Sequence, residues 1–100
     1  MPAYIVALVD EVRDPAGLQQ YAGAAAQLMA RFGGRYLFAS FGPQALEGDA
    51  APQAIAVSEF PDASRIQAFW RAPEYDPLRE LRQRSARVRI YLADAPPSAA

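Results

Sequence analysis

Glu59, Tyr75, Arg82 and Arg35 are the residues in this sequence whose side chains could serve a chemical site. A carboxylate can act as a general base, a phenol can donate a hydrogen bond, and a guanidinium binds carboxylates in a planar, bidentate manner. The chain has no His, Cys or Lys. The common zinc and haem ligand sets, the Cys-His and Ser-His nucleophiles and a Schiff base are therefore excluded, and no clustered Asp/Glu spacing indicates a metal site. We expect no built-in cofactor and no metal.

Glu59 stands at the end of a strand-like run in which Ile55 and Val57 share its face by period-two spacing. A carboxylate on an apolar face needs a partner or must take up a proton. Two interpretations stay open. Glu59 could be a general base or ligand anchor, or it could form an ion pair with an arginine or lie at a partly solvated strand end.

Arg82 shares a helical stripe with Tyr75 and Leu78, so its side chain is expected to point inward. We favour a buried ion pair with Glu59, in which the loss of one partner would cost roughly 3–5 kcal/mol. The alternative is that Arg82 binds the carboxylate of a substrate.

Three further residues have two interpretations each. Arg35 follows the Gly33-Gly34 turn and could line the mouth of a pocket, or it could be solvated or contact a second subunit. Tyr75 could offer its hydroxyl to a ligand or belong to the core, and Trp70 could be a pocket wall or a core residue.

The elements that must hold these residues follow from periodicity and turn signals. Asp14-Pro15 supplies a cap and a first helical residue, an apolar stripe at helical spacing runs to Phe32, and Gly33 ends the helix. Two shorter helices are expected after Pro61-Asp62 and near Pro73 or Pro77. The predicted strands are Ala3 to Val9, Arg35 to Phe41, Gln53 to Phe60 and Val88 to Leu92. The order β-α-β-β-α-β, with a broken second helix, predicts an α+β domain in which a four-stranded antiparallel sheet carries its helices on one face.

Both faces of the predicted strands are apolar. In the first strand Tyr4, Val6 and Leu8 alternate with residues that are equally apolar. Helices can cover only one face, and an exposed apolar sheet would exceed what monomers normally tolerate. The pattern therefore predicts a homodimer in which two copies share that face.

Composition limits the class of protein. One hundred residues suffice for a single domain, which we place at residues 1–95 with a flexible tail at 96–100. The net charge of −1, with both signs interspersed, predicts no nucleic-acid partner, and no apolar run is long enough to predict a membrane span. The cysteine-free chain, without a signal-peptide pattern, is expected in the cytoplasm.

Nearly the whole chain, from Tyr4 to about Leu92, resembles the DUF1330 family. The matching segments are AYIVALVDEVRDPAGLQQY, FGGRYLF, LEGD and SEFPD, followed by FWRAPEYDPLRELRQRS. The resemblance implies a ferredoxin-like domain that pairs into a dimeric α/β barrel, a fold that hosts many chemistries. Pro77 departs from the family pattern, so the helix is expected to restart there with Asp76 as its cap.

The leading functional hypothesis is a homodimeric domain that binds a small anionic or aromatic molecule in a polar pocket between sheet and helices. Arg82, Arg35 and Trp70 would bind the ligand. A second hypothesis is a cofactor-free enzyme, monooxygenase- or isomerase-like, with Glu59 as base and Tyr75 as a second catalytic group. A third is a structural or interaction domain with a filled core.

Overall fold

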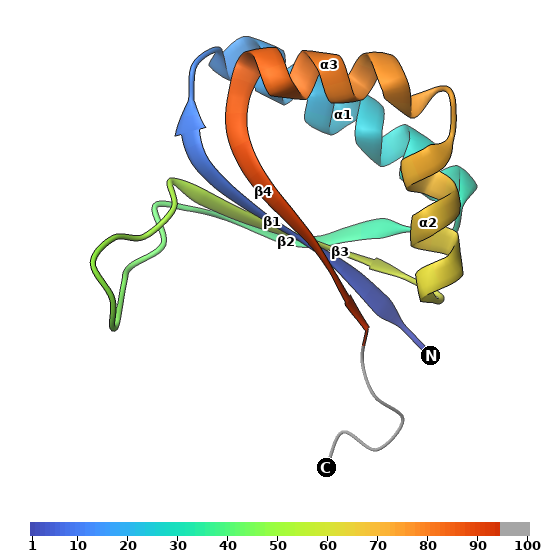
Figure 1. Ribbon diagram of the computed structural model, residues 1–100, viewed down its shortest axis with the longest axis horizontal. Coiled ribbons are helices and arrows are strands. Elements are labelled where there is room, and N and C mark those ends of the chain that lie inside the picture. Colours follow the sequence, from blue (N-terminus) through green and yellow to red (C-terminus); the bar gives the residue numbers. More distant parts are fainter. Residues whose placement is uncertain (95–100) are drawn as a thin grey trace.

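A four-stranded antiparallel sheet carries three helices on one face (Figure 1). The computed structural model describes residues 1–94. In chain order the elements are β1 (Ala3–Val12), α1 (Pro15–Arg31), β2 (Arg35–Phe41), β3 (Ala54–Phe60), α2 (Ala63–Arg71), α3 (Tyr75–Ser85) and β4 (Ala86–Asp94). The strand order is β2-β3-β1-β4, and α1 and α3 run side by side over the sheet. The predicted ferredoxin-like α+β fold is confirmed, and the predicted tail at 96–100 lies outside the described residues.

The start and end of α1 follow the sequence signals. Asp14 has the extended backbone of a capping residue, Pro15 is the first helical residue, and the main chain turns at Gly33 with a φ of 80°. Glycine adopts that left-handed conformation without steric cost. The amides of Arg13 and Asp14 also donate to the carbonyl of Ser85, which ties the start of α1 to the end of α3.

The second helical region differs from the prediction at its restart. Helix α3 begins at Tyr75, after Glu74, rather than at Pro77 with Asp76 as cap. Pro77 is then the third residue of the helix, where its missing N–H costs nothing because the first four amides of a helix have no intrahelical partner. This earlier start places Tyr75 inside the helix and one face of α3 over the sheet.

A bulge in β2 changes which of its side chains face the helices. Tyr36 pairs with Ser58 and Phe38 pairs with Val57, so Leu37 is the extra residue. Phe38 therefore lies on the outer face, away from the helices, and not on the face of Tyr36 as a regular alternation would have it.

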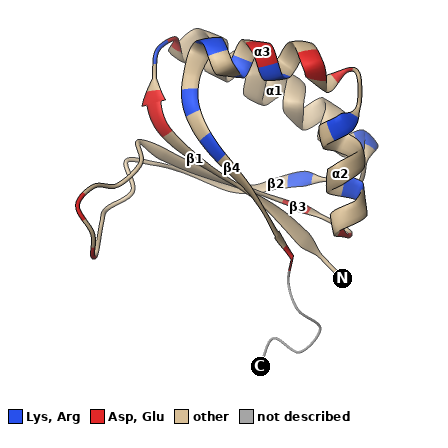
Figure 2. Cartoon of the chain, in the orientation of Figure 1, with Lys and Arg blue, Asp and Glu red and all other residues tan. Residues whose placement is uncertain are grey.

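The outer face of the sheet is apolar at its centre. Phe38, Val57, Val6 and Tyr91 stand in register across all four strands. Figure 2 shows the middle of the sheet free of charged residues, which gather on the helices and towards the strand ends. We call the row of these four residues the central outer row.

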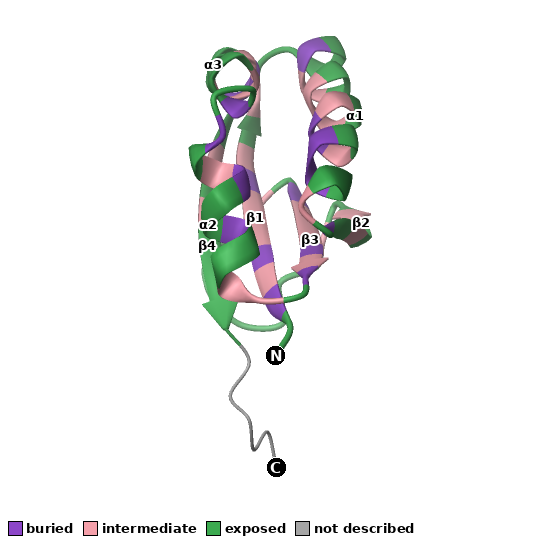
Figure 3. Cartoon of the chain, turned by 90° about the vertical axis from the view of Figure 1, so that its right-hand side faces the viewer, coloured by how far each residue is buried: buried purple, intermediate pink, exposed green. Residues whose placement is uncertain are grey.

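The core lies between the sheet and the helices. Buried positions of β1 and β3 alternate with partly exposed ones and face the helical layer (Figure 3). The buried apolar cluster comprises Ala3, Ile5, Ala25, Leu28, Met29, Phe60, Ile66, Phe69 and Tyr75. Within residues 1–94, no helix is both long and apolar enough to cross a membrane.

Candidate functional site

A cavity of about 360 Å³ lies between the helical layer and the sheet, and residues of all three helices and all four strands line it. This volume is at the lower end of the range of small-molecule pockets, roughly 300–1,000 Å³. The walls are almost entirely apolar. They include Ile5, Val9, Leu18, Ala22, Met29, Ala39, Phe41, Ala56, Phe69, Val88 and Ile90. The pocket was predicted to be polar. Its lining is instead mainly apolar, and only a few of the lining side chains carry polar groups.

Arg82, Tyr75 and Tyr21 form the main polar cluster of this cavity. Nη1 of Arg82 donates to the hydroxyl of Tyr75 at 2.6 Å, and the hydroxyls of Tyr75 and Tyr21 are 2.8 Å apart. All three residues line the cavity, and Arg82 and Tyr75 are only 7% and 1% exposed. The cluster is built because Tyr75 and Arg82 are two turns apart on α3, while α1 passes alongside with Tyr21 on its inner stripe.

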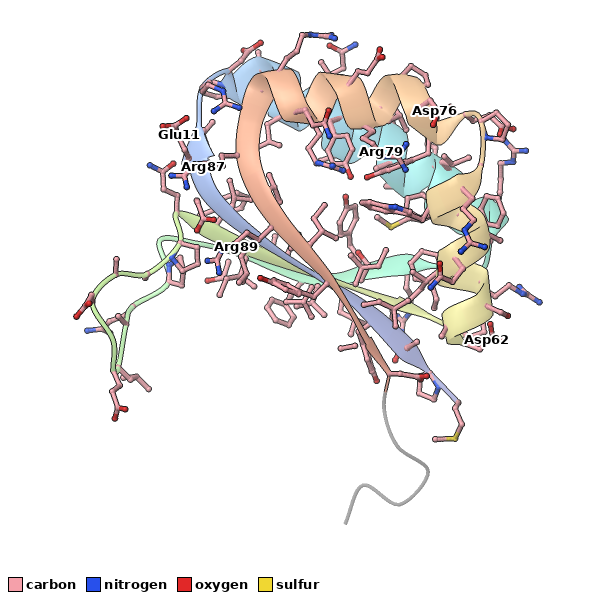
Figure 4. The ribbon with its side chains drawn as sticks, in the orientation of Figure 1. Glu11, Asp62, Asp76, Arg79, Arg87 and Arg89 are labelled. Atoms are coloured by element: carbon pink, nitrogen blue, oxygen red, sulfur yellow. The ribbon has the colours of Figure 1, made fainter. Side chains whose placement is uncertain are left out.

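Aromatic rings surround the guanidinium of Arg82. Its central carbon lies 5.6–5.9 Å from the ring centroids of Trp70, Tyr75 and Tyr21. Arg79, one turn earlier on α3, stacks 4.8 Å from the rings of Trp70 and Tyr75 and donates to the carbonyl of Trp70. Arg79 does not line the cavity, and Figure 4 shows it beneath α3 on the side toward α2.

Two phenols in the cavity are held in their neutral form. Burial raises the pKa of Tyr75, and the neighbouring Tyr21 raises it further. Burial also raises the pKa of Tyr36. Both hydroxyls are therefore hydrogen-bond donors at neutral pH, and neither supplies a phenolate base.

Glu59 lies outside the cavity. Its carboxylate accepts a hydrogen bond of 3.1 Å from Nη2 of Arg35, its direct neighbour across the β2–β3 ladder on the outer face. The predicted pair between Glu59 and Arg82 is therefore wrong, because residues on the strand face of Ile55 and Val57 point away from the helices. Arg35 is largely exposed and belongs to this outer pair rather than to the cavity mouth.

The other predicted site residues are brought together. Tyr75, Arg82 and Trp70 all line the cavity, and the guanidinium of Arg82 lies beside the rings of the other two. Tyr21 belongs to the apolar stripe that predicted the first helix, and its hydroxyl was not singled out from the sequence. The signal was present, since Tyr21 is the one residue of that stripe that carries a polar group. Within residues 1–94, no group of three or more His, Cys, Asp or Glu is arranged to hold a metal ion.

The family model of a domain of unknown function, DUF1330, matches residues 2–96. The chain belongs to the DUF1330 family. No curated protein sequence matches it.

Solved structures share the fold at low sequence identity. A protein of unknown function from Rhodopseudomonas palustris, RPA0582, is 19% identical with a TM-score of 0.76, covering 93% of this chain and 81% of that one. SnoaB, a cofactor-independent oxygenase from Streptomyces nogalater, is 14% identical with a TM-score of 0.70, covering 97% and 95%. A dimeric ferredoxin-like protein of unknown function from Thermobifida fusca is 13% identical with a TM-score of 0.62, covering 94% and 91%. At these identities the likeness shows a shared fold.

Proposed function

We propose that this DUF1330 protein is a homodimer that binds a small molecule in the cavity between the helices and the sheet. The observation that carries the proposal is the cavity itself, which has apolar walls and a buried arginine among its lining residues. A concave, mostly apolar pocket with a few convergent polar groups is the usual form of a ligand site. A cavity of about 360 Å³ argues against the filled-core alternative.

The homodimer is supported by the apolar outer face of the sheet. Phe38 and Tyr91 of the central outer row are 53% and 50% exposed in the single chain. A second copy would cover this row through a two-fold contact, and proteins described as dimeric share the fold. The cytoplasmic location stays a prediction from composition.

Native mass spectrometry of freshly purified protein tests the binding function. The expected result is a dimer that carries a small molecule. The variant Ala22→Phe should lose that added mass, because Ala22 lines the cavity and a phenyl ring would fill part of it. Ala30→Phe is the matched control, since Ala30 is exposed on the same helix and lies outside the cavity lining.

Loss of the bound mass in Ala30→Phe as well would indicate damage to α1 rather than a filled pocket. If no mass is bound, small-molecule titration of the same two variants decides the proposal. Equal affinity for Ala22→Phe and the parent protein would place binding elsewhere and contradict the proposed site.

A cofactor-free enzyme is the second candidate, and the arrangement of Arg82 with the hydroxyls of Tyr75 and Tyr21 favours it. Buried donors aimed at one point stabilise a developing enolate or phenolate. Glu59 could serve as base only for a molecule bound at the outer sheet face, because it does not line the cavity. Full turnover by a Glu59→Gln variant would exclude it as the base.

A further inference from the structure

Among the residues that the structure describes, Arg82 is a buried cation without a charged partner. Within residues 1–94 its guanidinium forms no ion pair, while five other arginines do. A buried charge is costly unless it is paired, and removing its partner leaves that cost uncompensated. In this chain the hydroxyl of Tyr75 supplies one neutral acceptor, so a negative charge beside Arg82 would be stabilised.

The guanidinium also has unused donors that reach accessible space. A guanidinium has five N–H donors, and among the described residues only Nη1 of Arg82 is hydrogen-bonded. No side-chain nitrogen or oxygen in this part of the chain is both sealed from solvent and unpaired. Arg82 is itself buried and lines the cavity, so the cavity is open space within reach of its remaining donors.

The phenols of Tyr75 and Tyr21 leave one further hydrogen-bond donor beside Arg82. The hydroxyls of Tyr75 and Tyr21 hold two protons and share one hydrogen bond of 2.8 Å. Only one of the two protons can lie in that bond, whichever tyrosine is the donor. The other proton is free to point at an acceptor, so guanidinium and phenol donors lie next to each other in the lining of the cavity.

We infer that the cavity takes a predominantly apolar small molecule with a single oxyanion, such as an arylalkanoate, whose charged end is bound by Arg82 and the Tyr75–Tyr21 pair. This inference rests on the proposed binding function and names the class of its ligand. The walls accept an apolar body but offer no second cation, since Arg82 is the one basic residue among the described residues that line the cavity. Dianions and cations would each leave a charge without a partner there.

The opposing interpretation is that the aromatic rings alone satisfy Arg82. Cation–π contacts are strongest within about 6 Å of a ring centroid, and all three rings lie close to that limit, at 5.6–5.9 Å. Under that interpretation the cavity would not distinguish an anion from a neutral molecule of the same shape. The two interpretations therefore differ in one measurable selectivity.

The test compares 3-phenylpropanoate with 3-phenylpropanamide, which have the same body and differ in charge. Trp70 is the only tryptophan and lines the cavity, so its fluorescence reports occupancy with excitation where neither ligand absorbs. We expect the anion to bind roughly 10- to 100-fold more tightly than the amide, as for a hydrogen bond to a charged group. Arg82→Gln should abolish that preference while the amide still binds.

Two variants keep the test valid if Arg82→Gln fails to fold. Tyr21→Phe retains the ring and removes one hydroxyl, so it should reduce the anion preference by a few-fold. Arg79→Gln is the matched control, because Arg79 has the same charge on the same helix and stacks on Trp70 and Tyr75, yet lies outside the cavity lining. It should leave the preference unchanged.

Each outcome decides between the inference and the function on which it rests. Equal affinities for the two ligands in the parent protein would overturn the anion site and leave the binding function standing. An anion preference that survives Arg82→Gln would also overturn it. If neither ligand binds at millimolar concentration, and no added mass accompanies the purified protein, the binding function itself fails.

Discussion

At the residue scale, the hydroxyl of Tyr75 connects Arg82 to Tyr21. We expect Tyr75→Phe to lower the free energy of unfolding by about 1–3 kcal/mol, because it leaves a buried guanidinium without its acceptor and keeps the ring. Urea unfolding at fixed protein concentration measures this. Tyr75→Leu should cost more, since it also removes ring contacts to Phe69 and Trp70 at 4.8 and 5.2 Å.

A double-mutant cycle separates the hydrogen bond from packing. In Tyr75→Phe combined with Arg82→Met, both partners of the 2.6 Å bond are gone, so no charge stays buried without an acceptor. The double variant should lose less stability than the sum of the two single changes. Full additivity would contradict the coupling between the two side chains.

The sequence predicted which residues would be buried better than it predicted their partners. The stripe of Tyr75, Leu78 and Arg82 placed Arg82 inward, and the structure has it there. Glu59 was paired with Arg82 because periodicity shows which residues share a strand face but not whether that face turns towards the helices. The burial of Ser58 and Phe60 shows that their face does so, and Glu59 therefore lies on the opposite, outer face.

At the element scale, the elements themselves were predictable and their irregularities were not. Capping residues, glycines and periodicity gave all four strands and α1. The bulge at Leu37 leaves no signal, since its neighbours Tyr36, Phe38 and Ala39 are aromatic or apolar and either alternation looks acceptable. The start of α3 was placed too late because proline was taken as the first helical residue, whereas the first turn accepts it at later positions too.

The turn from α1 to β2 depends on the absence of a side chain at Gly34. A Cβ there would lie 2.5 Å from ring carbons of Phe60, which is 1% exposed and cannot move aside. We expect Gly34→Ala to destabilise the protein by about 1–3 kcal/mol through overpacking. Chemical unfolding measures the change.

Gly23 provides the matched control for that substitution. It is an exposed residue inside α1, and a Cβ there would meet nothing within 4 Å. Gly23→Ala should therefore stabilise the protein, by about 0.5–1 kcal/mol, because alanine loses less backbone entropy in a helix. The same sign at both positions would contradict the close approach of Phe60.

The N-terminus of α2 should contribute a pH-dependent part of stability. Asp62, labelled in Figure 4, lies at the start of α2. It accepts hydrogen bonds from the hydroxyl of Ser64 at 2.7 Å and the amide of Arg65 at 2.9 Å. The Ser64 hydroxyl, then the Arg65 amide, hold the pKa of Asp62 below its usual value. The folded state thus binds this proton less readily than the unfolded chain. The stabilisation is complete above about pH 4 and is lost as the pH falls through the folded pKa.

Asp62→Asn isolates this effect, since asparagine keeps a capping oxygen but takes up no proton. Unfolding measured from about pH 6 down to about pH 2 should show parent and variant converging in stability as the acid limit is approached. A constant difference across this range would contradict the proposed role of the carboxylate.

At the scale of the whole molecule, the two faces of the sheet have different surroundings. The face toward the helices forms the cavity, and the outer face presents the central outer row between two ion pairs, Arg35–Glu59 and Arg89–Asp10. The Arg89 guanidinium also holds the pKa of Asp10 below its usual value. Charges near the ends of an apolar row limit how a second copy can be placed on it, because a shifted register would set them against apolar residues.

Val57 stands within the central outer row, where a lysine would put an unpaired charge between two apolar sheets. We expect Val57→Lys to convert the proposed dimer into a monomer at micromolar concentration, measured by light scattering coupled to size exclusion. Leu46→Lys is the control: this residue is 97% exposed in the β2–β3 loop, so the same kind of change should leave the dimer intact. A Val57→Lys protein that stays dimeric would show that the copies meet elsewhere. Because the cavity lies on the opposite face of the sheet, the monomer should still bind 3-phenylpropanoate, so assembly and binding can be tested independently.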